Sequence, residues 1–212
     1  LRAKNYQELY SHSSDYFDRE CLSFTDQEAF VDCGGYTGDT IESFLKEMEA
    51  FQAIYSLELD EDNYQKLCRY VDTLPKEIRQ KITCYRLGVW DEKTTVSYGN
   101  ETDSPQEASS ILKTSNEKTV EADRLDHILE EKPVTFIKMD IEGAELRALK
   151  GAQRILKEQK PKLAICLYHK VQDFWEIPSY LKEIVPEYRF EVRHHFWLSL
   201  YGTVLYAQYP ET

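Results

Sequence analysis

The 212-residue chain contains little glycine and proline, with 8 and 7 residues, and only five cysteines. This composition excludes a collagen-like or low-complexity chain. The cysteines are odd in number, widely spaced and without a CxxC pair, so we expect neither a disulfide framework nor a zinc site. We expect reduced, mostly buried thiols in a cytoplasmic protein.

Positive charge is also scarce, because 26 Lys and Arg face 38 Asp and Glu for a net charge of −12. Phosphate groups are bound by clusters of basic side chains, so we expect neither nucleic acid nor an anionic membrane surface as a partner. No segment approaches the roughly 18 apolar residues of a membrane span, and we see no signal peptide. At roughly 150 residues per domain, the length indicates one domain with an extension.

Apolar runs alternate with segments of helical periodicity along the chain. We expect a helical N-terminal extension over 1–28 and a domain over 29–212. The predicted strands are 29–33, 53–57, 82–89, 94–98, 118–122, 135–141, 162–169, 189–196 and 203–209. The predicted helices are 40–50, 62–72, 125–130, 143–159 and 178–185. This order predicts a three-layer α/β fold with a mainly parallel sheet and an antiparallel end, whose ligand binds beyond the carboxyl ends of the strands.

A glycine-rich turn follows the first predicted strand, with Asp32 at the strand end. Glycines let a backbone approach a ligand closely, and the next helix offers free N–H groups. The GxGxxG frame of dinucleotide folds would need glycine at Cys33, so the match fails there. An acid followed by GxxxG, formed by Gly34 and Gly38, favours S-adenosylmethionine, which is cationic and has no pyrophosphate. A tight structural turn is the alternative.

Glu58 follows the second predicted strand, 20 residues after Gly38. This spacing places a carboxylate where it can accept hydrogen bonds from both ribose hydroxyls of a bound nucleoside. The alternative is an ordinary solvated acid.

The fourth long strand ends in the most specific segment, residues 136–145. Phe136, Lys138 and Asp140 face the same way in a strand. A lysine in such an apolar strand is costly unless it is paired or functional. Alternatively, the three acids Asp140, Glu142 and Glu145 could cap the next helix, but capping leaves Lys138 unexplained.

These segments resemble the FkbM family of S-adenosylmethionine-dependent methyltransferases, and the resemblance covers about residues 28–209. The residues that carry it are FVDCGGYTGDT (30–40), Glu58, Ala-Ser-Ser (108–110), Arg-Leu-Asp (124–126) and FIKMDIEGAELRALKGA (136–152). The resemblance implies the class I, Rossmann-like methyltransferase fold, a seven-stranded sheet whose last strand is antiparallel. It also implies methyl transfer from S-adenosylmethionine, usually to an oxygen of a sugar or natural product.

The resemblance also assigns residues to the site. The expected cofactor-binding residues are Asp32, Gly34, Gly35, Gly38, Thr40, Glu58 and Asp140. The acids Asp140, Glu142 and Glu145 map near the site of methyl transfer. The chain departs from the family pattern in two places. Only His169 remains of an acid-and-histidine pair after the fifth long strand, and Gly88 stands where alanine is common.

We predict Asp140 and His169 as the bases that take the proton of the acceptor, with Glu142 beside them. Alternatively, Asp140, Glu142 and His169 hold a divalent metal, or His169 is a surface residue. Trp90 could stack on adenine or belong to the core. Aromatic residues that could line an acceptor pocket, or pack in the core or an interface, are Tyr168, Phe174, Trp175, Phe196, Trp197 and Tyr201.

The expected acceptor is a small molecule or glycan. Two other functions stay open, a non-catalytic protein that binds S-adenosylmethionine and a nicotinamide dehydrogenase. The missing first glycine of GxGxxG disfavours the dehydrogenase.

Overall fold

The computed structural model describes residues 16–98, 118–195 and 201–210. Its strands are β1 (Ala29–Cys33), β2 (Ala53–Glu58), β3 (Ile82–Arg86), β4 (Gly88–Val89), β5 (Thr94–Tyr98), β6 (Lys118–Asp123), β7 (Phe136–Met139), β8 (Lys162–Cys166), β9 (Arg189–His194) and β10 (Thr203–Gln208). Its helices are α1 (Asp39–Glu47), α2 (Glu61–Thr73), α3 (Lys76–Arg79), α4 (Leu125–Ile128), α5 (Glu145–Lys150), α6 (Gln153–Glu158) and α7 (Asp173–Ile184).

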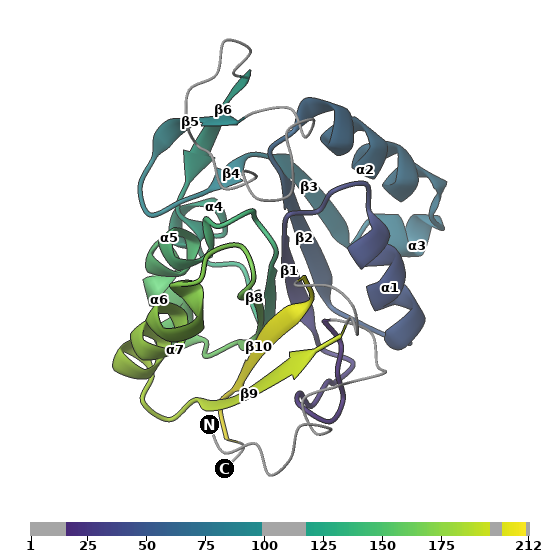
Figure 1. The fold of residues 1–212 in the computed structure, drawn as a ribbon. Helices are drawn as coiled ribbons and strands as arrows, with labels where there is room; N and C mark the ends of the chain where they lie inside the picture. Colours follow the sequence, from purple (N-terminus) through teal and green to yellow (C-terminus); the bar gives the residue numbers. More distant parts are fainter. Residues whose placement is uncertain (1–15, 99–117, 196–200, 211–212) are drawn as a thin grey trace.

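Seven strands form one sheet in the order β3-β2-β1-β7-β8-β10-β9 (Figure 1). Neighbours from β3 to β8 pair in parallel, whereas β10 runs antiparallel to both β8 and β9. This confirms the predicted sheet, including the closing hairpin. Strand β1 lies between β2 and β7, and all five of its residues are buried, as expected for a central parallel strand.

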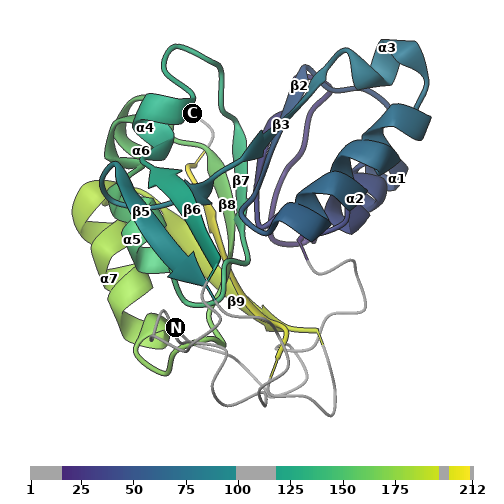
Figure 2. The same ribbon diagram turned by 90° about the horizontal axis from the view of Figure 1, so that it is seen from above.

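Helices cover the two faces of the sheet, which confirms the three-layer fold. In Figure 2, α1, α2 and α3 lie on one side and α4 to α7 on the other. Phe44 of α1 and Leu67 of α2 pack in one core with Phe30 of β1. Leu149 of α5 and Leu181 of α7 belong to the core of the opposite face. Because β1, β2, β7 and β8 pair in parallel, their carboxyl ends share one edge of the sheet.

The N-terminal segment before β1 joins this core without a helix. Residues 16–28 consist of turns and irregular backbone, so the predicted helical extension is wrong for this part, while residues 1–15 lie outside the described residues. Phe17 and Leu22 are buried, and Phe17 contacts Phe30 and Phe136 at ring distances of 5.8 Å. Apolar packing on the sheet holds the segment, and the division at residue 28 stays a prediction.

Two predicted elements are divided in the structure. The helix expected over 143–159 is interrupted between α5 and α6, where a side chain on Gly151 would lie 2.0 Å from the carbonyl oxygen of Trp90. The strand expected over 82–89 ends at Arg86, and β4 joins a separate sheet of order β4-β6-β5. Strands β7 and β8 also end earlier than expected, which leaves Asp140 and His169 in the loops just beyond them.

Among the described residues, no helix is long and apolar enough to span a membrane.

Candidate active site

The glycine-rich turn after β1 packs closely against the loop after β7. The amides of Gly34 and Gly35 donate to the carbonyl of Leu57, at 2.9 and 3.0 Å. Gly34 has φ +85°, and a Cβ there would lie 2.0 Å from the carbonyl oxygen of Asp140. Gly38 has φ +94° and is the N-cap residue just before α1, and Thr40 is buried in the first turn of that helix. Packing within the protein therefore already requires glycine at Gly34, whatever ligand binds.

A buried ion pair lies beneath this turn. The Lys138 ammonium is 3.2 Å from Asp32 Oδ1 and donates to the carbonyl of Gly34 at 2.7 Å. Ser56 donates to the other Asp32 oxygen at 3.0 Å. Burial lowers the pKa of Lys138, but the charges of Asp32 and Asp140 outweigh burial and raise it, so the lysine stays a cation. Through Lys138 and Ser56, these contacts support the turn from below.

Glu58 ends β2 and faces the same turn. Its carboxylate accepts hydrogen bonds from the backbone amides of Tyr36 and Asp60, both at 2.8 Å. Burial raises the pKa of this carboxyl group, although the two amides oppose the rise. The acid is therefore held in place beside the turn and is not an ordinary solvated residue. Its contact with ribose stays a prediction.

Asp140 lies just beyond β7 and binds two tyrosine hydroxyls. Tyr16 donates to Oδ2 at 2.8 Å and Tyr168 donates to Oδ1 at 2.9 Å. Burial raises the pKa of Asp140, but Lys138, His169 and the two hydroxyls outweigh burial and lower it. Helix α5 begins at Glu145 and has no side-chain cap. The helix-capping interpretation of Asp140 is therefore wrong.

His169, beyond β8, is enclosed by carboxylates, with its side chain only 6% exposed. Its Nδ1 lies 2.9 Å from Glu145 Oε1, and its Nε2 lies 3.3 Å from Asp140 Oδ1 and 3.5 Å from Glu142 Oε2. Burial lowers the pKa of the imidazole, but the hydrogen bond of Glu145 and the surrounding negative charges raise it overall. The alternative of a surface histidine is wrong.

The residues near His169 differ from the predicted metal set of Asp140, Glu142 and His169. The donor atoms that lie within 4.8 Å of one another belong to Asp140, Glu145 and His169, without Glu142. Both imidazole nitrogens already face carboxylates, so a divalent ion would have to displace one of these contacts. The protein's own ion pairs are sufficient to explain the arrangement.

Several predicted residues have other neighbours than expected, or none that can be described. The ring of Trp90 lies 4.9 Å from the Arg147 guanidinium, so adenine stacking stays a prediction. Asp126 accepts hydrogen bonds from two amides in the first turn of α6, those of Arg154 and Ile155. Phe174, Trp175 and Tyr201 are 45%, 54% and 42% exposed. Phe196, Trp197 and residues 108–110 lie outside the described residues.

Tyr16 is a residue of this candidate site that sequence reasoning missed. Its hydroxyl reaches Asp140 across 124 residues of chain, and its ring lies 5.1 Å from the Lys138 ammonium. Nothing in the local sequence around Tyr16 signals this contact, because it depends on how the N-terminal segment packs over the sheet.

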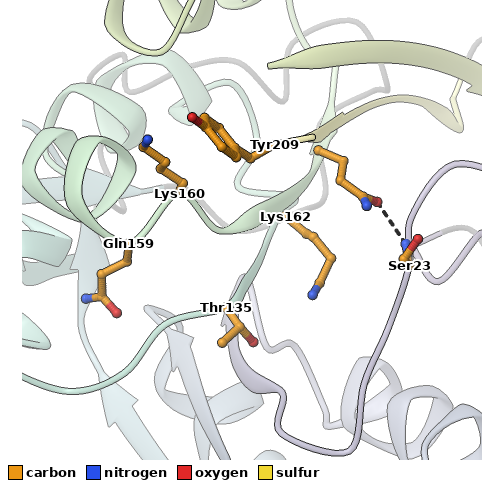
Figure 3. Close-up of a pocket in the computed structure, with 7 residues that line it drawn as sticks. Ser23, Thr135, Gln159, Lys160, Lys162 and Tyr209 are labelled. Carbon is orange, nitrogen blue, oxygen red and sulfur yellow. Dashed lines mark hydrogen bonds between the residues drawn. The ribbon is translucent and has the colours of Figure 1, made fainter. Parts of the chain in front are cut away.

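A cavity of about 210 Å³ lies at the other end of the sheet (Figure 3). Its lining residues are Ser23, Thr135, Gln159, Lys160, Lys162, Gln208 and Tyr209. Gln208 accepts from the amide of Ser23, and Lys162 pairs with Glu28. These polar groups are engaged in joining the N-terminal segment to the sheet, away from the cluster at Asp140.

Two distant structural relatives share the fold, and their similarity extends over most of this chain. An rRNA methylase from Streptococcus thermophilus is 16% identical with a TM-score of 0.54, over 91% of this chain and 92% of that one. Fibrillarin from Aeropyrum pernix, solved with bound S-adenosyl-L-methionine, is 12% identical with a TM-score of 0.51, over 91% and 72%. The chain thus has the class I fold of S-adenosylmethionine-dependent methyltransferases.

Residues 32–200 match the methyltransferase FkbM domain. The chain is 31% identical to methyltransferase FkbM from Methylobacillus flagellatus KT, with a TM-score of 0.80, over 95% of this chain and 49% of that one. It belongs to the FkbM methyltransferase family, and it spans about half the length of that relative. No curated protein matches it significantly.

Proposed function

We propose that this protein transfers the methyl group of S-adenosylmethionine to a hydroxyl oxygen of a sugar or natural product. The observation that carries the proposal is the contact between two parts of the site. The turn at Gly34 packs against Asp140, and Asp140 in turn contacts His169. A cofactor beside the turn and an acceptor beside the imidazole would then be neighbours.

The reaction requires little covalent chemistry from the protein itself. When bound, S-adenosylmethionine supplies a methyl group on a sulfonium, which is an activated leaving group. The protein must align the acceptor oxygen and remove its proton. Alignment can contribute up to roughly 7–11 kcal/mol, and a general base a factor of about 10²–10⁴.

The residues of the turn and of β2 fit the cofactor. Glu58 carries the carboxylate proposed for the ribose hydroxyls, and the segment from Asp32 through Gly34, Gly35 and Gly38 to Thr40 forms the proposed cradle. Lys138 holds that cradle through the Gly34 carbonyl. Asp140, Glu142 and His169 then lie on the acceptor side, where a proton must leave.

Exposed aromatic rings follow the same strand ends. Phe174 and Trp175 are exposed at the start of α7, and Tyr201 lies 5.5 Å from Tyr168, which contacts Asp140. Sugar faces stack on such rings, so these residues favour a glycan or glycosylated acceptor. We place the reaction in the cytoplasm, because all five cysteines are free thiols, as a reducing compartment maintains.

Two alternatives differ in what they predict for turnover. A non-catalytic protein of this fold would bind S-adenosylmethionine but would form no S-adenosylhomocysteine with any acceptor. A divalent metal at Asp140 and His169 would acidify the acceptor hydroxyl, and a chelator would then stop the reaction. The ion pairs of His169 favour proton transfer without a metal.

The test is a mass-shift screen over glycan and natural-product extracts with labelled S-adenosylmethionine. We expect one product heavier by a methylene unit and an equal amount of S-adenosylhomocysteine, with or without chelator. Methylation of a nitrogen or carbon atom, or binding without turnover over the whole panel, would contradict the proposal. Asp140→Asn serves as the control for product that does not come from this site.

A further inference from the structure

Glu145 is the buried acid of this site that has no assigned task. It opens α5, and its side chain is fully buried. One oxygen, Oε1, accepts from the amide of Ile141 at 3.0 Å and lies 2.9 Å from His169 Nδ1. The backbone contact fixes the direction of that oxygen, and the oxygen in turn faces the imidazole.

This contact decides which nitrogen of His169 carries the hydrogen. An ionised carboxylate can only accept hydrogen bonds, so Nδ1 must donate to Glu145. In the neutral imidazole the lone pair is then on Nε2. That nitrogen faces Asp140 and Glu142, at 3.3 and 3.5 Å, on the side of the strand ends.

We propose that Glu145 is a positioning residue, which holds His169 so that Nε2 takes the proton of the acceptor hydroxyl. This inference rests on the proposed function. As the new bond forms between the acceptor oxygen and the methyl carbon, the carbon–sulfur bond breaks and its electron pair goes to sulfur. The O–H bond breaks, its proton goes to Nε2, and solvent removes that proton after product leaves.

The contacts of Asp140 support this division of roles. Its two oxygens already accept from the hydroxyls of Tyr16 and Tyr168, so it has less freedom than His169 to take a proton. Once Nε2 holds the proton, it lies 3.3 Å from Asp140 Oδ1, and this carboxylate stabilises the imidazole cation. Asp173 of α7 adjoins this cluster, because the charges of Glu145, Lys170 and His169 all act on its carboxyl group.

Glu28 provides a matched control for Glu145. It is equally buried, it also accepts from a backbone amide, and its cationic partner is Lys162. It lies at the opposite end of β1 from the site. Glu28→Gln therefore makes the same chemical change at the same depth without touching His169.

The test is ¹⁵N NMR of the His169 side chain in the full chain, at a pH well above the imidazole's pKa, with His169→Gln to identify the signals. We expect a protonated Nδ1 and a bare Nε2 in the wild type and in Glu28→Gln. Glu145→Gln should keep this pattern, because the amide of Ile141 holds an oxygen toward Nδ1. Glu145→Ala should lose it.

Adding S-adenosylmethionine, and separately S-adenosylhomocysteine, tests where Nε2 lies. We expect the Nε2 signal to shift more with S-adenosylmethionine, which carries the methyl group and the positive charge, and this difference to shrink in Glu145→Ala. A neutral wild-type imidazole protonated on Nε2, or a Nε2 that responds equally to both compounds, would overturn the inference. Should Glu145→Ala not fold, the wild-type and Glu145→Gln spectra still decide.

Calorimetry keeps the two proposals apart. If the folded chain binds no S-adenosylmethionine, the proposed function is refuted, and so is the role of His169 in proton transfer. The Nδ1 signal would still show whether Glu145 orients His169. Tight binding together with a neutral His169 protonated on Nε2 would refute only the role of Glu145.

Discussion

Two buried clusters of acids and cations lie at opposite ends of the central strands, and they are built differently. At the amino end of β1, Glu28 pairs with Lys162 at 2.8 Å, accepts from Thr25, and binds the Thr135 hydroxyl with its second oxygen. At the carboxyl ends, Asp32 pairs with Lys138, and His169 lies among three carboxylates.

The difference lies in which oxygens are satisfied. Both oxygens of Glu28 have hydrogen-bond partners. Within the described part of the chain, Glu145 Oε2 and Asp173 Oδ2 are buried without one. Burying an unsatisfied polar atom costs free energy, and such costs are typical of functional sites. The amino end is thus arranged for stability, and the carboxyl end concentrates negative charge at a cost to stability.

The largest expected effect comes from removing each lysine. Lys138→Met leaves Asp32 as an unpaired buried charge, which costs about 3–5 kcal/mol of unfolding free energy. Lys162→Met should cost less, about 1–3 kcal/mol, because the Lys162 side chain is 16% exposed whereas that of Lys138 is 2% exposed. Urea unfolding of both variants measures the difference. Equal losses would mean that the two pairs are equivalent.

Asp140→Asn and Glu28→Gln separate function from stability. We expect Asp140→Asn to keep cofactor affinity within a few-fold and to lose roughly 10²-fold or more in turnover. His169→Ala should lose at least as much turnover, because His169 Nε2 is the proposed base and Asp140 acts through it. Glu28→Gln should lower thermal stability and leave turnover per folded molecule intact. Single-turnover transfer and thermal unfolding are measured on the same samples, and wild-type turnover in Asp140→Asn would refute the assignment of this strand end.

Glu58→Ala tests the cofactor side of the carboxyl-end site. Hydrogen bonds to a charged group contribute about 1.5–3 kcal/mol, so binding of S-adenosylmethionine should weaken by roughly 10–150-fold. Glu61→Ala is the control, because Glu61 lies nearby but pairs with Arg86. Calorimetry on the folded variants compares them. Unchanged affinity in Glu58→Ala would remove Glu58 from the site.

The smallest expected effect depends on pH. Burial, with the charge of Glu145, raises the pKa of Asp173 to about 6, from the usual 3.8. The folded state thus holds this proton more tightly than the unfolded chain does. Its contribution to stability is complete below the usual pKa and is lost as pH rises through about 6.

Asp173→Asn stays neutral at every pH, so it avoids that loss. We expect it to raise the free energy of unfolding by about 1 kcal/mol near pH 7.5 and to change it little near pH 4. Thermal unfolding at the two pH values is the measurement. A variant that is less stable at the higher pH would show that the Asp173 carboxylate is stabilised in the fold.

Local sequence was sufficient for much of the fold and for the positions of residues at the ends of β1 and β2. The apolar run of β1, the glycine turn and Glu58 were predicted within a few residues of their observed places. Lys138 was predicted to need a partner, because a lone lysine in an apolar strand is costly, and the structure shows that partner to be Asp32.

The remaining contacts of the site depend on chain segments that meet only in three dimensions. His169 and Glu145 lie 24 residues apart, and Tyr16 and Asp140 lie 124 apart. No periodicity within a strand or helix encodes such pairs. The need for glycine at Gly151 has a similar cause, because the carbonyl of Trp90 occupies the space beside it.

The central place of β1 has a consequence for how the chain is made. One edge of β1 pairs with β2, which follows directly in the sequence, but the other edge stays unpaired until β7 has been made. The lysine that supports the Gly34 turn comes 104 residues after that glycine. A nascent chain therefore carries an open strand edge and an unpaired acid while these 104 residues are made. This favours slow folding and a need for protection from aggregation until β7 emerges.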